Sequence, residues 1–101
     1  MSTQANKPLT IVATIKAKPE HVEQVKTELL KLTAASQDDQ GCIQYDLHQE
    51  NANSNGFVVY EIWENNECLQ QHVQSPHFQN YVQVTDGIVD EFVVTEMTVI
   101  S

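Results

Sequence analysis

The segment YEIWENNECLQQHVQSPHF, residues 60–78, passes from the pattern of a β-strand to that of a helix. Its first part completes a strand over residues 57–64, and both faces of that strand are mostly apolar. One face carries Phe57, Val59, Glu61 and Trp63, and the other carries Val58, Tyr60 and Ile62. A strand of this kind is typical of a sheet that is covered on both sides. Helices of the same chain can cover one side, and in so short a chain a second subunit is the natural cover for the other.

The second part of the segment has the pattern of two short helices that are interrupted at Ser75-Pro76. Asn65 or Asn66 is a suitable N-cap residue, because its side chain can accept a hydrogen bond from the first helical turn. The residues expected on the inward face of the first helix are Leu69, His72 and Val73. The second helix is expected to begin near Pro76 and to end at Asp86-Gly87. Its inward residues are expected to be Phe78, Tyr81 and Val82.

Outward from this segment, strands and helices alternate along the chain. Residues 9–18 alternate as a strand, and a helix is predicted from Pro19 to the stop at Gly41. Residues 42–50 form a strand with Ile43, Tyr45 and Leu47 on one face, and residues 91–100 form the last strand. The order βαββαβ predicts an α+β, ferredoxin-like fold, with helices on one face of a four-stranded antiparallel sheet. We expect one domain over residues 8–101, preceded by a disordered tail of residues 1–7.

The composition excludes several classes of partner. The 101 residues include fourteen acidic and five basic side chains, which give a formal net charge of −9, and the chain has no arginine. A surface of this sign repels nucleic acid and anionic membranes. No apolar stretch is long enough for a signal peptide or a membrane span, and two cysteines are too few for a disulfide framework. We therefore expect a cytoplasmic protein that binds neither nucleic acid nor membranes.

His72 and Trp63 are the main candidates for chemistry, and each has a structural alternative. A histidine on an inward helical face is either a core residue bonded to a backbone carbonyl or hydroxyl, or it lines a cavity and moves a proton. Trp63 is either a core residue or the wall of an aromatic pocket. Glu61 is an acid within an apolar strand, so it is either exposed at an edge or buried with a partner.

The sequence favours no metal site. Cys68 and His72 lie four residues apart and share a helical face, but a strong site needs three or four converging ligands. His77 lies five residues beyond His72, which is roughly 140° around an ideal helix. The chain also has no glycine-rich phosphate loop. We therefore expect neither a metal site nor a phosphate-binding loop.

The run E-x-W-E at residues 61–64 is followed by Leu69, His72, Ser75-Pro76-His77 and Phe78. Together with the turn at Gly41-Cys42 that leads into Tyr45, this combination resembles the antibiotic biosynthesis monooxygenase domain family. The resemblance covers residues 9–100. It implies a dimeric α+β barrel, in which two ferredoxin-like sheets pack together and each protomer holds a pocket between its sheet and its helices.

The resemblance also implies a chemistry. Known members of the family include cofactor-free monooxygenases of polycyclic aromatic quinol-type substrates, in which the substrate itself reduces dioxygen. On this sequence, Trp63 would be the aromatic wall and a hydrogen-bond donor, and His72 would be the acid or base. The residues expected to bind the substrate beside them are Tyr60, Glu61, His77, Phe78 and Tyr81.

This chain departs from two branches of the family. The polyketide-tailoring branch has an arginine in its pocket, and this chain has none. The haem-degrading branch has a later histidine where this chain has Tyr81-Val82. The leading prediction is a homodimeric, cofactor-free monooxygenase that acts on a small aromatic molecule. The alternatives are a non-catalytic dimeric protein that binds a small molecule, and an oxygen-independent isomerase on the same scaffold.

Overall fold

The computed structural model of the protein describes residues 8–101, so the tail predicted for residues 1–7 lies outside the described part of the chain. The elements in chain order are β1 (Leu9–Ala17), the 3-10 helix η2 (Pro19–His21), α1 (Val22–Ser36), β2 (Cys42–Gln49), β3 (Gly56–Trp63), α2 (Asn66–Val73), α3 (Pro76–Val84) and β4 (Val89–Met97). No helix within residues 8–101 is both long enough and apolar enough to cross a membrane.

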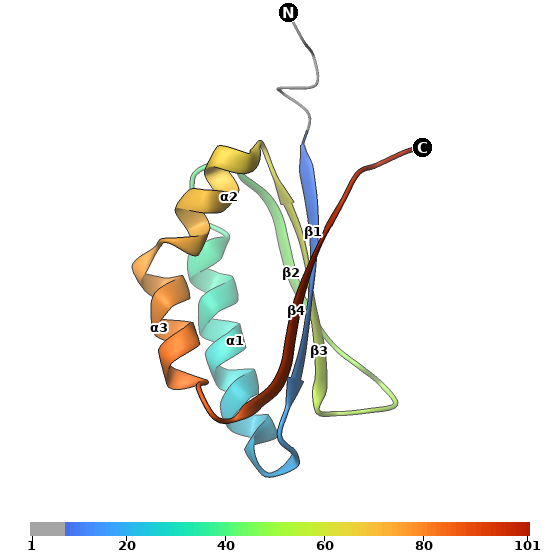
Figure 1. Cartoon of the computed structure of the whole chain (residues 1–101), viewed down its shortest axis with the longest axis vertical. Coiled ribbons are helices and arrows are strands. Elements are labelled where there is room, and N and C mark those ends of the chain that lie inside the picture. Colours follow the sequence, from blue (N-terminus) through green and yellow to red (C-terminus); the bar gives the residue numbers. More distant parts are fainter. Residues whose placement is uncertain (1–7) are drawn as a thin grey trace, which may run out of the picture.

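The four strands form one antiparallel sheet in the order β2-β3-β1-β4. Ala13, in the middle of β1, lies opposite Val59 of β3 on one side and opposite Val94 of β4 on the other. The three α-helices all pack on the same face of this sheet (Figure 1). This arrangement confirms the ferredoxin-like α+β fold that the order of elements predicts.

The core lies between the helices and this face of the sheet. Because side chains alternate along a strand, every second residue of β1 points toward the helices. The buried residues of this row are Ile11, Ala13, Ile15 and Ala17. Apolar residues that recur at helical spacing along α1 pack against them. The buried residues of this helical row are Val25, Leu29 and Leu32.

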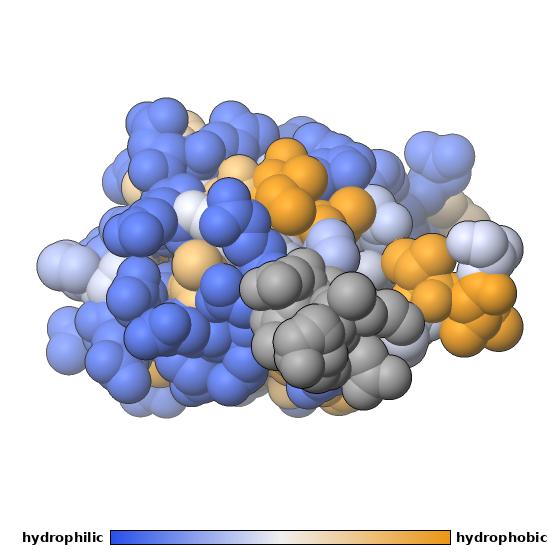
Figure 2. Space-filling view, turned by 90° about the horizontal axis from the view of Figure 1, so that it is seen from above, coloured by the Kyte–Doolittle hydropathy of each residue, from blue (hydrophilic) through white to orange (hydrophobic). Residues whose placement is uncertain are grey.

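The opposite face of the sheet is covered by no helix of the described chain (Figure 1). The apolar residues on this face include Val12, Val58, Ile62 and Val93. The edge strand β4 is the most open part of the sheet, since Val93 is 45% exposed and Met97 is 41% exposed. Figure 2 looks onto the end where the C-terminal segment emerges, and it shows apolar residues at the surface between hydrophilic ones. Because the strands carry apolar residues on both faces of the sheet, a single chain leaves one apolar face uncovered.

A β-bulge in β2 moves Ile43 out of the inward row in which the sequence pattern places it. Cys42 lies opposite Trp63, and the next paired residue, Gln44, lies opposite Ile62. The residue between them is left outside the alternation, as is usual for the extra residue of a bulge. Ile43 is therefore exposed, whereas Tyr45 is buried as predicted.

Two further features differ from what the sequence predicts: the inward face of α3 and the bounds of the last strand. The inward face of α3 is narrower than predicted, because Tyr81 is buried whereas Val82, one residue further around the helix, is exposed. The last strand begins at Val89 and ends at Met97, so Ile100 lies beyond its end and is exposed. A run of apolar residues near a chain end gives no signal for where pairing stops.

Candidate functional site

The interruption between α2 and α3 determines where the two histidines lie. Ser75 caps α3, because its hydroxyl accepts a hydrogen bond from the backbone N–H of Phe78 at 3.2 Å. Pro76 follows within the first turn of α3, where a missing N–H leaves no helical hydrogen bond unmade. The chain changes direction at this point, after the last turn of α2 that carries His72. His77, in the first turn of α3, therefore returns to the same side as His72.

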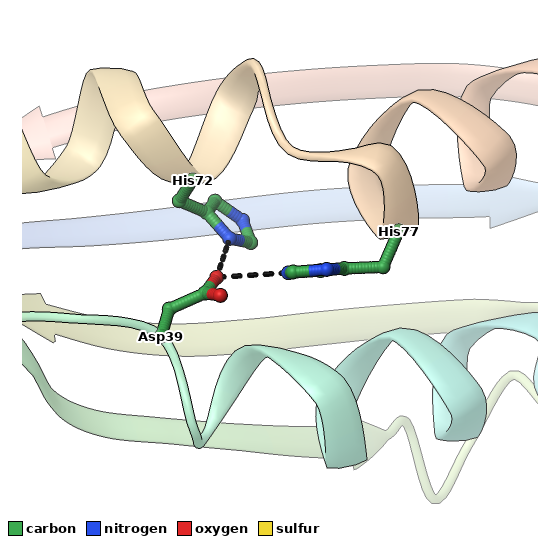
Figure 3. Close-up of side chains that lie close together, drawn as sticks. All are labelled: Asp39, His72 and His77. Carbon is green, nitrogen blue, oxygen red and sulfur yellow. Dashed lines mark hydrogen bonds and ion pairs between the residues drawn. The ribbon is translucent and has the colours of Figure 1, made fainter.

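Asp39, in the turn between α1 and β2, accepts hydrogen bonds from both histidines (Figure 3). Its Oδ2 atom lies 2.8 Å from Nδ1 of His72 and 2.9 Å from Nε2 of His77. The His72 side chain is only 2% exposed, whereas that of His77 is 27% exposed. One carboxylate thus connects a buried imidazole to one that reaches the surface.

The hydrogen bond to Asp39 determines where His72 carries its proton. Burial lowers the pKa of His72, and the hydrogen bond with Asp39 opposes this shift only in part. The neutral ring has one N–H, and the carboxylate at Nδ1 requires a donor there. Nε2 therefore keeps its lone pair, and it is buried without a hydrogen-bond partner among residues 8–101. A neutral histidine in this tautomer is suited to accept a proton.

His72 lines a cavity between the helices and the sheet. The cavity has a volume of about 50 Å³. At roughly 10–15 Å³ for each water molecule, it holds about four waters. It reaches the surface beside β4, where the side chains of Phe92 and Val94 are exposed. The walls are mostly apolar and include Ile11, Leu29, Val59, Leu69 and Phe78.

The further side chains with polar groups that line this cavity are Tyr45, Glu61 and Tyr81. Burial raises the pKa of Glu61 to about 7, although the hydrogen bond from Trp63 acts in the opposite direction. The hydroxyl of Tyr81 is buried and has no partner in the described chain, and burial raises the pKa of Tyr81 to about 12. An apolar cavity therefore holds a base at His72 together with a carboxyl group and a phenol that both favour their protonated forms.

Trp63 contacts both Glu61 and His72. Its indole N–H donates a hydrogen bond to Oε1 of Glu61 at 2.9 Å. Its ring lies 4.7 Å from that of His72, measured between centroids, with an angle of 35° between the planes. Tyr45 of β2 packs edge-on against both rings, at 6.3 Å from Trp63 and 5.5 Å from His72. The fully buried Trp63 thus holds Glu61 and His72 in place.

The residues predicted for the site fall into two groups. Those that line the cavity together are Glu61, His72, Phe78 and Tyr81. Trp63 lies beneath the ring of His72 and does not line the cavity. His77 lies on the far side of Asp39 and lines a separate hollow between α1 and α3. Tyr60 points to the opposite face of the sheet, because it neighbours the inward-facing Glu61 along β3.

Asp39 is the residue of this site that the sequence pattern does not reveal. The segment Gln37-Asp38-Asp39-Gln40 indicates the end of a helix, and an acid in a turn has no period that would point it inward. The signal that could find it is chemical. A histidine predicted on a buried helical face needs a polar partner. In this fold the chain returns to the sheet at Cys42, which brings Asp38 and Asp39 near His72.

A metal ion could be held by the same three residues. One ligand atom from each of Asp39, His72 and His77 lies within 4.8 Å of the other two. Cys68, which shares a helical face with His72, is not part of this group. The interruption at Ser75-Pro76 therefore creates a convergence that the spacing along one ideal helix does not predict.

Comparison with known proteins places the chain in a family. A sequence model of the family described as antibiotic biosynthesis monooxygenase matches residues 8–84. The Bacillus subtilis protein named "Putative monooxygenase YcnE" is 34% identical over 74 residues, which cover 73% of this chain and 78% of that protein. "Uncharacterized protein sll1783" of Synechocystis is 29% identical over 85 residues, which cover 84% of this chain. The match spans only 58% of that relative's length.

Solved structures share the fold over nearly the whole chain. PA3566 from Pseudomonas aeruginosa has a TM-score of 0.91 and 32% sequence identity, and the match covers 96% of this chain and 98% of that chain. A crystal structure described as an antibiotic biosynthesis monooxygenase has a TM-score of 0.87 at 23% identity, and it covers 92% of this chain and 99% of that chain. The chain belongs to the antibiotic biosynthesis monooxygenase family.

Proposed function

We propose that the protein is an oxidoreductase of the monooxygenase type, which oxidises a small aromatic, quinol-type compound with dioxygen and needs neither metal nor flavin. The observation that carries the proposal is that one apolar cavity is lined by both His72, with its unpartnered Nε2, and Glu61. Membership of the family supports the reaction class, since a relative carries the word monooxygenase in its name.

His72 starts the reaction by accepting a proton at Nε2 from a phenol or from an activated ring carbon. Asp39 stabilises the imidazolium that forms, because its carboxylate already accepts the Nδ1–H. A positioned base of this kind contributes about 10²–10⁴-fold to a rate. The anion left on the substrate is electron-rich and can reduce dioxygen. The apolar walls keep bulk water away from the reduced oxygen species.

Glu61 supplies the proton for the later step. Oxygen adds to the ring carbon as a peroxide anion, which takes back the proton that His72 holds. Neutral His72 then removes the remaining proton of that carbon, and the electron pair of the broken C–H bond forms the carbonyl as the O–O bond breaks. One oxygen atom remains on the carbon as a carbonyl, and the other takes a proton from Glu61 and leaves as water. All electrons come from the substrate, so no outside reductant is needed. A carboxyl group with a pKa of about 7 is protonated in a large share of molecules at neutral pH, and Trp63 holds its other oxygen.

The size of the cavity limits the substrate. A space for about four water molecules is too small for a ring system unless side chains move. Phe92 and Val94, at the mouth beside β4, are exposed and can turn outward, whereas Phe78 and Tyr81 are fixed by α3. We therefore expect the substrate to enter beside β4. Compounds with one or two fused rings should be preferred over compounds with larger ring systems.

A second copy of the chain is the partner that we propose for the uncovered sheet face. That face carries apolar side chains from three strands, including Tyr60 and Ile62 of β3 and Val93 of β4. Packing of two such faces would form the dimeric barrel that the resemblance implies, and it would extend the cavity mouth beside β4. Sheets that pack face to face bury apolar surface at about 25 cal/mol for each Å², which favours association.

An oxygen-independent isomerase is the second candidate, and the same pair of groups favours it. A neutral base at His72 and a neutral acid at Glu61 in one cavity can move a proton between two atoms of a substrate without any oxidant. This reaction exchanges a substrate C–H with solvent but consumes no oxygen.

Oxygen uptake with a panel of naphthols, reduced naphthoquinones and anthrones tests the proposal. The panel compares the wild type with His72→Gln, and with His21→Gln as the matched control, because His21 lies in η2 at the opposite end of the molecule from α2 (Figure 1). We expect uptake above the autoxidation blank for the wild type and the control, and a loss of about 100-fold or more in His72→Gln.

Uptake equal to the blank for every compound would contradict the monooxygenase proposal. Solvent deuterium entering the substrate without oxygen uptake would then identify the isomerase. Ligand binding without either reaction, and equally strong in His72→Gln, would identify a binding protein.

A further inference from the structure

We propose that Asp39, His72 and His77 form a binding site for one divalent transition-metal ion of the zinc type, and that this ion inhibits the enzyme. Three separate parts of the fold supply the donors: the turn after α1, the last turn of α2 and the first turn of α3 (Figure 3). The donor atoms are Oδ2 of Asp39, Nδ1 of His72 and Nε2 of His77, and they all lie within 4.8 Å of one another.

The distances from the Asp39 oxygen to the two histidine nitrogens are close to the distances between ligands around a bound ion. Zinc binds imidazole nitrogen and carboxylate oxygen at about 2.0–2.2 Å, so tetrahedral ligands lie about 3.4 Å apart. Oδ2 of Asp39 lies 2.8 Å and 2.9 Å from the two histidine nitrogens. Oδ2 of Asp39 needs to move away from each nitrogen by only about half an ångström for an ion to replace the two shared protons, and the two nitrogens lie within 4.8 Å of each other. The donor set of two imidazoles and one carboxylate suits zinc, cobalt and nickel, and it leaves a position for water.

An ion can reach this position from solvent. His77 is 27% exposed and Asp39 is 17% exposed, so the outer side of the site is open. Asp39 lies in a turn, and His77 lies at the start of a helix, where small shifts disturb little of the core. The formal net charge of −9 also raises the local concentration of cations around the chain.

Metal binding and base catalysis exclude each other at His72. The ion would take the lone pair of Nδ1, so the one proton of the neutral ring would move to Nε2. Nε2 would then donate a hydrogen bond and could no longer accept a proton from a substrate. This inhibitory consequence rests on the proposed function, whereas the binding site itself does not.

Titration of the metal-free protein with zinc chloride, followed by calorimetry, and with cobalt chloride, followed by visible absorption, tests the site without any substrate. The variants are Asp39→Asn and His77→Gln, and His21→Gln is the matched control. We expect one saturable site in the wild type and in the control. Replacing a residue that only supports a metal ligand already weakens binding about 10-fold. Each variant removes a ligand itself, so we expect it to bind zinc at least about 10-fold more weakly.

Nuclear magnetic resonance of the wild type gives a second measurement that needs no variant. Zinc should shift the ring nitrogens of His72 and His77 together, while those of His21 stay in place. No saturable binding, or equal affinity in all variants, would overturn the proposal. A thiolate absorption band of bound cobalt would also overturn it, because it would place the ion at Cys42 or Cys68. None of these readouts needs turnover. A failure of the metal site can therefore be distinguished from a failure of the oxygenase proposal.

Discussion

His72 is a buried side chain with a polar neighbour on one side only. Asp39 binds its Nδ1 at 2.8 Å, whereas its Nε2 has no partner in the described chain. A buried polar atom without a partner costs roughly 1–3 kcal/mol of stability. A position chosen for packing alone would favour an apolar side chain of similar size. The unpaired nitrogen therefore fits a site that completes its hydrogen bonds only when a ligand binds.

Asp39→Asn tests whether the carboxylate positions His72. The amide can still occupy the same place, but it carries no charge to stabilise an imidazolium. We predict that kcat falls at least about 100-fold, while KM changes little, because Asp39 does not line the cavity. Steady-state oxygen uptake gives both constants. A loss that lies in KM alone would argue against a positioning role.

Glu61 makes the stability of the protein depend on pH. Its folded-state pKa of about 7 lies above the unfolded value of 4.5, so the folded state holds a proton that the unfolded state has lost. The stability from this proton is fully present below about pH 4.5 and is lost as the pH rises through about 7. At about 1.4 kcal/mol for each pH unit, the loss reaches about 3 kcal/mol.

Glu61→Gln should remove this dependence, because the amide stays neutral and can still accept the hydrogen bond of Trp63. We predict that the wild type loses about 3 kcal/mol more than Glu61→Gln between pH 5 and pH 9, as measured by urea unfolding at each pH. Parallel curves for the two proteins would show that Glu61 ionises as freely as an exposed acid.

At the scale of the elements, two glycines occupy similar backbone conformations in different surroundings. Gly41 has a φ of 77°, and Gly87 has a φ of 84°. A Cβ added at Gly41 would collide with the side chain of Cys68 in α2, whereas a Cβ at Gly87 would meet no described atom within 4 Å. The difference between the two positions therefore reports how closely α2 packs on the turn that carries Asp39.

Gly41→Ala should destabilise the protein more than Gly87→Ala does. Both changes carry the left-handed strain of roughly 1–2 kcal/mol, and only the first adds a steric clash of about 1–3 kcal/mol. Urea unfolding measures both losses. We predict that adding Cys68→Ala to Gly41→Ala recovers part of the extra loss. Equal losses at the two glycines would mean that α2 does not pack on this turn.

The periodicity of apolar residues was sufficient to predict the elements and their order. Alternation along β1 and the helical spacing of Val25, Leu29 and Leu32 depend on local geometry, which a sequence shows directly. The bulge at Ile43 was not predictable, because the pairing of two strands decides which residue is left out. The contact between Asp39 and His72 joins residues that are 33 positions apart, and no local pattern specifies it.

At the scale of the whole molecule, one layer of helices covers a sheet that is apolar on both faces. On the face that the helices do not cover, the described chain leaves Val93 and Met97 of the edge strand exposed. A small domain buries only part of the surface that its unfolded chain exposes, so burial of this face against a second copy would add stability. The cavity opens beside the same strand, so the proposed dimer would link assembly to access to the site.

Val93→Asp should prevent association, because it places a charge on the uncovered face, at the edge strand β4. Val82→Asp is the matched control, since Val82 is 42% exposed on α3, on the helical side of the molecule, and Val93 is 45% exposed. We predict that sedimentation gives the mass of two chains for the wild type and for Val82→Asp, and of one chain for Val93→Asp. A monomeric wild type would contradict the proposed dimer.

The proposed catalysis by His72 requires an unprotonated Nε2 at neutral pH. The ¹⁵N shifts and two-bond proton–nitrogen correlations of the ring report directly which nitrogen carries the proton, and His72→Gln assigns the signals. In the metal-free protein we predict a protonated Nδ1, held by Asp39, and an Nε2 that keeps its lone pair. A proton on Nε2, or on both nitrogens, would contradict the assignment of His72 as the base.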